Sequence, residues 1–277
     1  MGPLLTLQVH EAMLAAVRDS TESLVCSLDL DRSTTTVSVA ADAWSWQDRR
    51  YPYLDNCKDR TIYYWAGEAF ESIARFTNSL IKLVPTQWGP PTFEIDGIKM
   101  LPTAQVSPWV DAERKVALIK PRGKTVLDTC GGLGYFAAWC LQGQAERILS
   151  YEKNPDVLWL RTLNPWSPHT DGDSNSRLTL TQGDISEEIR NIADSSVDAI
   201  LHDPPRFGIA GELYSQSFYD HLARVLRRNG MLFHYTGTPN RLTSGRDVPN
   251  EVANRLRTAG FTTRLIGDGV LAVKKGR

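Results

Sequence analysis

The sequence predicts an α/β protein in which a small β-rich N-terminal domain (residues 1–105) precedes a larger domain (residues 106–277) built on a parallel, doubly wound sheet. Three observations predict this. After residue 120, short apolar runs alternate with amphipathic helical segments. The first of these runs ends in a glycine-rich turn that leads into a helix. Before residue 106, short β-branched and aromatic runs are separated by polar breaks.

The composition is that of a globular protein with a substantial core. The chain has 277 residues, of which 42% are hydrophobic and 23% charged, and its formal net charge is −1. This balance gives no general attraction to nucleic acid or to an anionic membrane. No apolar run approaches the ~20 residues of a spanning helix, and no secretory signal is evident at the N-terminus. We therefore expect a cytoplasmic protein without a membrane partner.

The cysteines form neither a metal pattern nor a disulfide pattern. Cys26, Cys57, Cys130 and Cys140 are scattered, without a C-x-x-C pair. The sequence therefore argues against structural zinc and against a disulfide framework, and we expect no metal.

The N-terminal domain is expected to start with a helix over residues 8–18, where apolar side chains recur at helical spacing. Residues 24–31 and 34–40 are typical of a hairpin. Further strands are expected at residues 51–53, 61–65, 79–84 and 93–98. Residues 68–75 fit either a helical turn or a strand. The many aromatic residues of this domain either fill the core of a small sheet or stack on a planar substrate.

The second domain is expected to follow a connecting helix over residues 107–120. Its strands are predicted at residues 125–128, 148–152, 178–182, 197–202 and 230–235. Helices are predicted to start near Tyr135, Pro155, Ser186 and Ser215, the last of them running to residue 228 with Gly230 as its C-cap. A helix over residues 249–259 and a hairpin of residues 261–266 and 270–274 end the chain. Ligands of such sheets bind beyond the carboxyl ends of the strands, so we expect the site at the first strand's turn.

Acidic residues end four of the predicted strand segments or follow them directly. Asp128, which precedes the turn Thr129-Cys130-Gly131-Gly132-Leu133-Gly134, is followed along the chain by Glu152, Asp184 and Asp203. Glycines let a ligand approach the backbone, and the helix start offers free N–H groups. Glu152 is suited to accept hydrogen bonds from two ribose hydroxyls. An exposed carboxylate would also explain Glu152, and a helix N-cap would explain Asp184. Their repetition at successive strand ends favours a nucleotide-sized ligand.

These segments resemble the motifs of class I S-adenosylmethionine-dependent methyltransferases. Residues 128–134 resemble motif I, Tyr151-Glu152-Lys153 the second motif, Gly183-Asp184-Ile185 the third, and His202-Asp203-Pro204-Pro205-Arg206 motif IV in its D/N-P-P form. The likeness covers residues 120–277 and extends to a mostly archaeal group of predicted methyltransferases. It implies a Rossmann-like seven-stranded sheet, parallel with a closing antiparallel hairpin strand. It also implies S-adenosyl-L-methionine as the cofactor and S-adenosyl-L-homocysteine as the product.

The resemblance further implies how the cofactor is held. Its methionine part would pass close to Gly132 and Gly134, and Asp184 would accept a hydrogen bond from the adenine amine. Cys130 replaces the usual first glycine of the turn, and we interpret it as a packing residue. The implied cofactor contacts are Asp128, Cys130, Gly132, Gly134, Glu152, Asp184, Ile185 and Asp203.

In D/N-P-P enzymes the two prolines, here Pro204 and Pro205, keep the loop rigid while the acidic residue, here Asp203, orients the target nitrogen, so that positioning carries most of the catalysis. The D-P-P-R form also resembles C5-uridine methyltransferases, whose covalent route needs a late cysteine. No cysteine follows Cys140, which excludes that route. His234 is a candidate to take the proton of the methylated amine, although a scaffold histidine is the alternative.

The candidate substrate contacts surround this loop. They are His202, Arg206, Phe207, Tyr214 and Tyr235. His234 and Tyr235 are expected to face the same crevice. Arg206 either binds a phosphate or carboxylate of the substrate or pairs with a nearby acid, and Arg241 and Arg246 are expected at the mouth of the site.

The sequence therefore predicts an S-adenosylmethionine-dependent methyltransferase that acts on nitrogen. We expect an RNA base as the acceptor, because the motif IV form and the added domain resemble RNA-modifying enzymes. The alternative acceptor is a small molecule (an amine, an amino acid or a heterocycle), which the near-zero net charge favours. Aminopropyl transfer would need a G-G-G-D-type turn that is missing here, and a protein that only binds the cofactor would not need an intact Asp-Pro-Pro loop.

Overall fold

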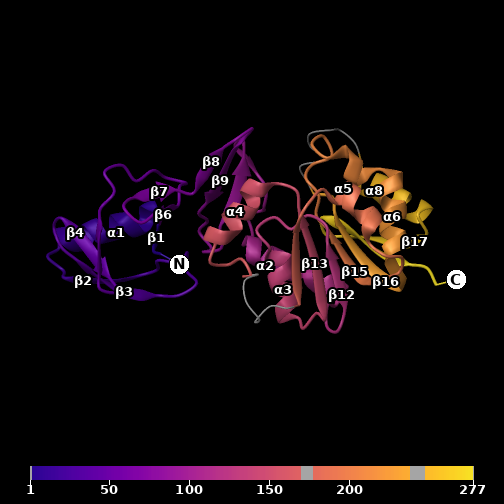
Figure 1. Ribbon diagram of the computed structural model, residues 1–277, viewed down its shortest axis with the longest axis horizontal. Coiled ribbons are helices and arrows are strands. Elements are labelled where there is room, and N and C mark those ends of the chain that lie inside the picture. The colour runs from indigo at the N-terminus through magenta and orange to yellow at the C-terminus, as the bar shows by residue number, and fades with distance from the viewer. Residues whose placement is uncertain (1, 170–176, 238–246, 277) are drawn as a thin grey trace. The chain divides into compact units, whose positions relative to one another are not determined.

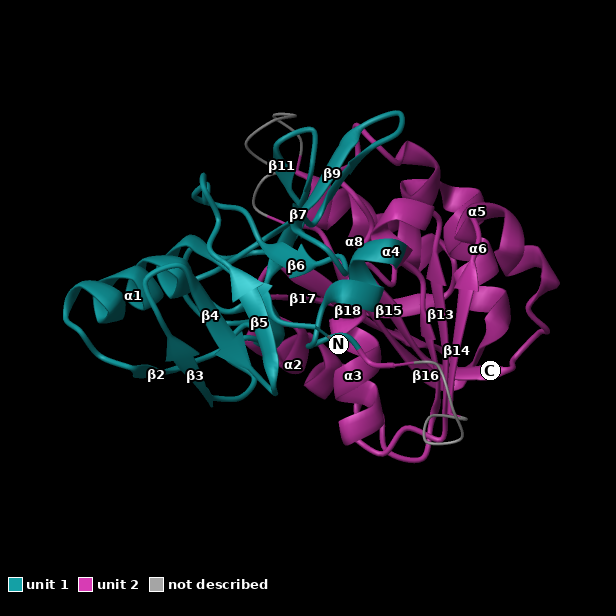
Figure 2. Cartoon of the chain, turned by 60° about the vertical axis from the view of Figure 1, so that its left-hand side comes forward, with its two compact units in different colours: residues 1–109, 159–167 teal, residues 110–158, 168–277 magenta. Residues whose placement is uncertain are grey.

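A computed structural model describes residues 2–169, 177–237 and 247–276 (Figure 1). Arg241 and Arg246 lie outside the described residues. The chain forms two compact units (Figure 2): the first is Met1–Trp109 with Trp159–Ser167, and the second is Val110–Leu158 with Pro168–Arg277. The chain therefore returns to the first unit after it has begun the second.

The first unit contains helix α1 (Leu7–Arg18), whose N-cap Thr6 accepts a hydrogen bond from the backbone N–H of Val9. Short antiparallel strands make up most of the rest. They are β1 (Leu4–Leu5), β2 (Ser23–Cys26), β3 (Thr35–Val39), β4 (Ala43–Trp46), β5 (Arg49–Pro52), β6 (Tyr63–Trp65), β7 (Phe70–Ser72), β8 (Ala74–Phe76), β9 (Leu80–Val84), β10 (Thr92–Ile95) and β11 (Ile98–Lys99). They pair in three sheets of order β2-β3-β4-β5, β1-β6-β7 and β11-β10-β9-β8.

The strands differ from the prediction in particular places. The segment 68–75, which fits two structures in the sequence, contributes strands β7 and β8. The predicted strand 24–31 ends at Cys26, and Leu30 and Asp31 have φ angles of +56° and +61° that a strand cannot contain. Strands β1 and β4 are absent from the prediction.

Aromatic side chains form the core of the first unit. Trp44 is fully buried and stacks on Tyr51 with ring centroids 4.5 Å apart. Trp65 meets Tyr51 edge-on, and Phe70 stacks on Trp44, lies tilted against Tyr51 and meets Trp65 edge-on. For these four residues the core explanation holds, because rings that pack against one another in this way are not free to stack on a substrate.

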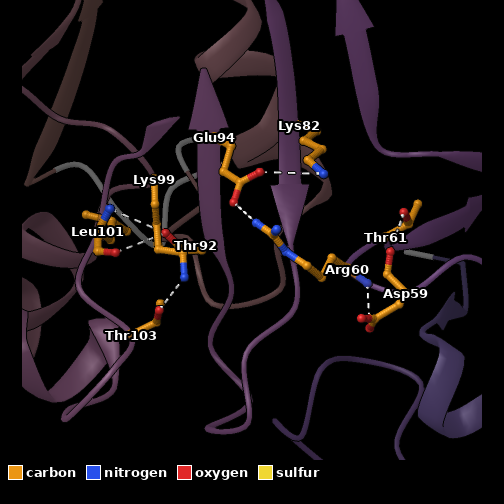
Figure 3. Close-up of polar contacts among 9 residues, drawn as sticks. All are labelled: Asp59, Arg60, Thr61, Lys82, Thr92, Glu94, Lys99, Leu101 and Thr103. Atoms are coloured by element: carbon orange, nitrogen blue, oxygen red, sulfur yellow. Dashed lines mark hydrogen bonds and ion pairs between the residues drawn. The ribbon is translucent and has the colours of Figure 1, made fainter. Parts of the chain in front are cut away.

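A buried carboxylate connects the β8–β11 sheet to a neighbouring loop (Figure 3). The side chain of Glu94 on β10 is 3% exposed; it accepts a hydrogen bond from Arg60 and lies 3.5 Å from Nζ of Lys82 on β9. Two cations offset the cost of burying this one carboxylate. Arg60 thereby fixes the loop before β6 to the sheet.

The second unit is built on a seven-stranded sheet of order β14-β13-β12-β15-β16-β18-β17. Its strands are β12 (Thr125–Asp128), β13 (Arg147–Glu152), β14 (Leu178–Gln182), β15 (Val197–His202), β16 (Leu226–Tyr235), β17 (Phe261–Ile266) and β18 (Gly269–Lys274). Strands β12 to β16 are parallel, and β18 is antiparallel to both β16 and β17. The predicted parallel sheet with a closing hairpin strand is confirmed.

Helices cover both faces of this sheet (Figure 1). They are α2 (Pro108–Ile119), α3 (Tyr135–Gln142), α5 (Ile185–Glu188), α6 (Gln216–Val225) and α8 (Val248–Thr258), with 3-10 turns η2 (Ile189–Asn191) and η3 (Gly211–Tyr214). Helix α4 (Pro155–Leu163) begins in the second unit and continues into the first. Successive residues of a strand point to opposite faces. Accordingly, Leu127 packs with α5, α6 and α8, whereas its neighbour Val126 packs with α2 and α3. No described helix is both long enough and apolar enough to cross a bilayer.

The prediction of Gly230 as a helix C-cap is wrong. Helix α6 ends at Val225 and β16 begins at the next residue. The register shifts between the pairs Val197–Leu226 and Ala199–Met231, so Gly230 lies in a bulge of β16. A Cβ atom at Gly230 would lie 2.6 Å from Cγ of Leu226, which explains the glycine by close packing rather than by helix termination.

Candidate functional site

The glycine-rich turn lies where the strand order of the sheet reverses. Strand β12 is followed in sequence by β13 on one side but pairs with β15 on the other. Gly132 and Gly134 have φ angles of +48° and +83°, a region that glycine enters without strain. Gly134 is the N-cap of α3, and its N–H donates to the carbonyl of Gly131 at 2.7 Å. The turn therefore has the compact form of a nucleotide-binding turn.

Asp128 and Cys130 flank this turn on the interior side. Asp128 is 1% exposed, and its Oδ2 accepts a hydrogen bond of 2.8 Å from the hydroxyl of Ser150 on β13. Cys130 packs against the core of the unit, and burial raises the pKa of its thiol well above the usual value. A thiol that does not ionise is a poor nucleophile, which agrees with the interpretation of Cys130 as packing.

The carboxylate of Glu152 is fixed at the end of β13. Its Oε2 accepts from the backbone N–H of Gly132 at 2.9 Å, and its Oε1 accepts from the N–H of Asn154 at 2.8 Å. A carboxylate oxygen has two lone pairs and can accept more than one hydrogen bond. Glu152 is thus joined to the glycine turn and is not a loose surface carboxylate.

Asp184 caps helix α5 and also pairs with a lysine. Its Oδ1 accepts from the backbone N–H and the hydroxyl of Ser186 at 2.9 and 2.7 Å, and its Oδ2 lies 2.7 Å from Nζ of Lys153. Burial alone would raise the pKa of Asp184, but the hydrogen bonds from Lys153 and Ser186 outweigh it and lower the pKa. The side chain of Ile185 is buried in the core. The N-cap explanation of Asp184 therefore holds, and a role toward the adenine would be additional to it.

A buried lysine, which the sequence did not single out, lies at the Asp203 loop. Nζ of Lys115 on α2 is 3.2 Å from Oδ2 of Asp203 and 2.8 Å from Oδ2 of Asp111, one helical turn earlier. It also lies 3.9 Å from the ring centroid of Tyr235. The only sequence signal was the spacing of Asp111 and Lys115, which is equally typical of an exposed ion pair on a helix surface.

Lys115 and Asp203 each stabilise the charged form of the other. Burial alone would lower the pKa of Lys115, but Asp203 and Asp111 outweigh it and raise the pKa above the usual value. Burial raises the pKa of Asp203, and the ammonium of Lys115 opposes that rise. The lysine is therefore charged at neutral pH, and it favours the ionised form of the aspartate.

The rest of the Asp203 loop contacts η3. The hydroxyl of Tyr214 donates to the carbonyl of Pro205 at 3.0 Å, and the ring of Phe207 packs edge-on against Tyr214 at 5.4 Å. Tyr214 is 1% exposed and supports the loop, and its predicted contact with the substrate stays a prediction. No ion pair joins Arg206 to a carboxylate within the described part of the chain.

The two candidate histidines form a buried network. In His202, Nδ1 is 2.7 Å from the hydroxyl of Thr129 and Nε2 is 3.1 Å from the carbonyl of Leu213. A carbonyl can only accept, so Nε2 carries the proton and Nδ1 is the acceptor of the neutral ring; the Thr129 hydroxyl is shared between Nδ1 and the carbonyl of Leu201 at 3.2 Å. By the same logic, Nδ1 of His234 donates to its neighbour's carbonyl at 2.8 Å, and Nε2 accepts from the hydroxyl of Tyr219 at 2.9 Å. Both rings are neutral and fully buried.

The expectation that His234 and Tyr235 face the same crevice is wrong. Adjacent residues of a strand point to opposite faces: His234 contacts Tyr219 of α6, and Tyr235 contacts Lys115 of α2. Because both of its ring nitrogens are engaged, His234 is poorly placed to take a proton from an acceptor. The same geometry argues against His202 as a substrate contact. Both histidines belong to the scaffold that joins the glycine turn to β15 and β16.

Acid is expected to destabilise the protein through these histidines. Burial lowers the pKa of His202 to about 4 and, with a contribution from His202, lowers that of His234 well below its usual value. The unfolded chain therefore binds more protons below pH 6.5, and stability falls from there until the folded pKa is reached. His202 alone would account for about 2 kcal/mol between pH 7 and pH 5. Urea unfolding at the two pH values measures the loss, which His234→Gln should reduce; equal stability of the wild type at both would contradict the prediction.

Comparison with known proteins identifies the family. The family described as S-adenosyl-L-methionine-dependent methyltransferase matches residues 154–240. Uncharacterized protein MJ1233 of Methanocaldococcus jannaschii is 42% identical over 212 residues, which are 75% of this chain and 71% of that protein.

Solved structures of the same fold include two spermidine synthase structures. One, a complex with the transition-state analogue AdoDATO, has a TM-score of 0.60 at 18% identity and covers 73% of this chain and 72% of its own. The spermidine synthase of Thermotoga maritima has a TM-score of 0.57 at 18% identity, with 74% of each chain covered. At this identity the likeness shows the fold alone. The first turn and the strand ends of the sheet have the geometry described above. Together with the matched family and the archaeal relative, they show that the chain belongs to the S-adenosyl-L-methionine-dependent methyltransferases.

Proposed function

We propose that the enzyme transfers the methyl group of S-adenosyl-L-methionine to a nitrogen atom of an RNA base. The main support for a nitrogen acceptor is the hydrogen bonding of the Asp203 carboxylate. Its Oδ2 faces Lys115 at 3.2 Å, whereas Oδ1 has no hydrogen-bond partner among the described residues. An ionised carboxylate oxygen next to the cofactor site is suited to accept a hydrogen bond from an N–H group.

The residues present fit the cofactor. Gly132 and Gly134, in the left-handed region, carry no Cβ atom and would let its methionine part approach the backbone. Glu152, held by two backbone N–H groups, would accept hydrogen bonds from the ribose hydroxyls. Asp128 would hold the amino group, and Asp184 would meet the adenine amine. The bound cofactor supplies a methyl group made electrophilic by its sulfonium.

The protein's part in the reaction is to position the acceptor. Asp203 would accept a hydrogen bond from the acceptor nitrogen and thereby aim its lone pair at the methyl group. Pro204, and Pro205 with its carbonyl held by Tyr214, keep the loop from relaxing. A reacting pair held in line gains most of its rate from orientation. The methylated nitrogen then loses its proton to Asp203 or to solvent.

Arg206 supports an acceptor that carries phosphate. It follows the two prolines directly and forms no ion pair with a described carboxylate, so its charge is available to a phosphate group of RNA. A small-molecule amine is the second candidate. Three carboxylates interact with the single ammonium of Lys115, namely Asp111, Asp203 and Asp268, and this excess negative charge favours a cationic amine.

Tritiated methyl transfer separates these acceptors. The enzyme is incubated with methyl-labelled S-adenosylmethionine and either total RNA or a small-metabolite extract, with the Asp203→Ala variant as the control for background labelling. We expect label in RNA that digestion releases as an N-methylated nucleoside. Label confined to small molecules would show that the RNA proposal is wrong. A parallel incubation with decarboxylated cofactor labelled in its aminopropyl group tests the aminopropyl alternative.

A further inference from the structure

The burial of Lys115 is unusual for a lysine on a helix. The residue is 3% exposed, and its ammonium is surrounded by two carboxylates and two rings: Asp111, Asp203, Tyr235 at 3.9 Å and Phe136 at 5.7 Å. Lysine is almost never fully buried unless it is paired. Stability alone does not explain it, because a well-packed apolar residue usually replaces a buried ion pair without loss.

The ammonium of Lys115 is held in place by Asp111 of α2 and by the ring of Tyr235 of β16. Asp111 lies one turn before Lys115 on the same helix, so their contact at 2.8 Å is set by α2 itself. The face of the Tyr235 ring attracts the cation. Tyr235 is in turn confined by Gly237, where a Cβ atom would lie 2.9 to 3.0 Å from the ring. Two elements, α2 and β16, thus hold Lys115 against the Asp203 loop.

Fixing Lys115 has a direct effect on Asp203. The ammonium engages Oδ2 only, so the carboxylate plane is restrained while Oδ1 stays available. The groups that face Lys115 are Asp111 on α2, Asp203 after β15, Tyr235 on β16 and Asp268 between β17 and β18; Phe136 on α3 is apolar. Among these groups, Lys115 is the one cation that opposes protonation of Asp203.

We propose that Lys115 is a positioning residue for methyl transfer: it holds Asp203 ionised and in one orientation, so that Oδ1 meets the nitrogen of the acceptor. This inference rests on the proposed function, because it requires Asp203 to be the carboxylate that receives the acceptor. Lys115 itself touches neither acceptor nor cofactor in this scheme. It acts only through Asp203.

The test follows the titration of Asp203 directly. The full chain is labelled with ¹³C at the aspartate carboxyl carbon, its carboxyl shifts are followed against pH by NMR, and the Asp203 signal is assigned with Asp203→Asn. In Lys115→Met, which keeps the length of the side chain but not its charge, we expect the Asp203 midpoint to rise by at least about one pH unit. Lys115→Arg should keep it near that of the wild type. Lys82→Met, which removes a lysine from an ion pair in the first unit, is the matched control and should not move it.

A second readout links the titration to catalysis. The acid limb of the pH–rate profile for methyl transfer to total RNA should move upward in Lys115→Met together with the Asp203 midpoint, whereas a purely structural role would lower the rate at every pH without moving the limb. An Asp203 midpoint identical in Lys115→Met and in the wild type would overturn the proposal.

Asp111→Asn covers the case in which Lys115→Met does not fold. Removing this like charge, which raises the pKa of Asp203, should lower the Asp203 midpoint, and an unchanged midpoint would again overturn the proposal. The titration uses no acceptor. A shifted midpoint without labelling of RNA would therefore reject the RNA acceptor while supporting the coupling of Lys115 to Asp203.

Discussion

Replacing Asp203 with alanine is expected to lower the rate of methyl transfer by at least about 100-fold while leaving the affinity for S-adenosylhomocysteine nearly unchanged. The carboxylate is the group that would orient the acceptor nitrogen, and misplacing a reacting atom by about 1 Å costs a factor of this size. The fold should survive, because Lys115 keeps its ion pair with Asp111 at 2.8 Å. Single-turnover label transfer measures the rate, and calorimetry measures the affinity.

The matched control for this variant is Asp220→Ala, which removes an exposed aspartate of the same unit that accepts a hydrogen bond from Gln216 of its own helix. Its rate should equal that of the wild type. If Asp203→Ala transfers methyl groups as fast as the wild type, the orientation of the acceptor does not depend on this carboxylate.

Replacing Glu152 with alanine is expected to weaken the binding of S-adenosylhomocysteine by about 100-fold or more. Two charge-assisted hydrogen bonds to the ribose would be lost, each contributing about 1.5 kcal/mol or more. The N–H groups of Gly132 and Asn154 would also lose their acceptor, which loosens the turn. Calorimetric titration with S-adenosylhomocysteine measures the change.

Glu187→Ala is the matched control for Glu152→Ala, since it removes an exposed carboxylate from α5 and leaves the strand ends intact. Its affinity should remain that of the wild type. Undiminished binding by Glu152→Ala would contradict the assignment of the ribose contact. Reduced binding by both variants to the same degree would point instead to the overall charge of the surface.

The sheet of the second unit was predictable because its signals are local. Each parallel strand is a short apolar run that ends at a polar residue, and a buried strand needs little else to be recognised. The bulge around Gly230 was not predictable in this way, because a glycine after an amphipathic helix is equally typical of a C-cap. The packing of Leu226 against Gly230 distinguishes a bulge from a C-cap, and this packing exists only once the strand has formed.

The candidate site was predictable where backbone and strand ends define it and unpredictable where side chains from distant segments meet. Gly132, Gly134 and Glu152 follow from motif and spacing. Lys115 does not, because its partner Asp203 lies far along the chain and only the tertiary fold brings α2 to the loop after β15. The hydrogen bonds that hold His202 and His234 within the fold were not predictable, because the sequence places both residues at strand ends but does not tell which partners surround each ring.

The return of the chain to the first unit has a consequence for synthesis. Residues 159–167 complete that unit: Arg75 covers the ring of Trp159, and the indole N–H of Trp166 donates to the carbonyl of Leu30 at 2.8 Å. A ribosome makes these residues only after β12, α3 and β13 have been synthesised. The N-terminal unit therefore cannot finish folding as it leaves the ribosome first. The segment that contains the glycine turn and Glu152 is made before that unit is complete, so a chain that stops before residue 159 contains neither unit in full.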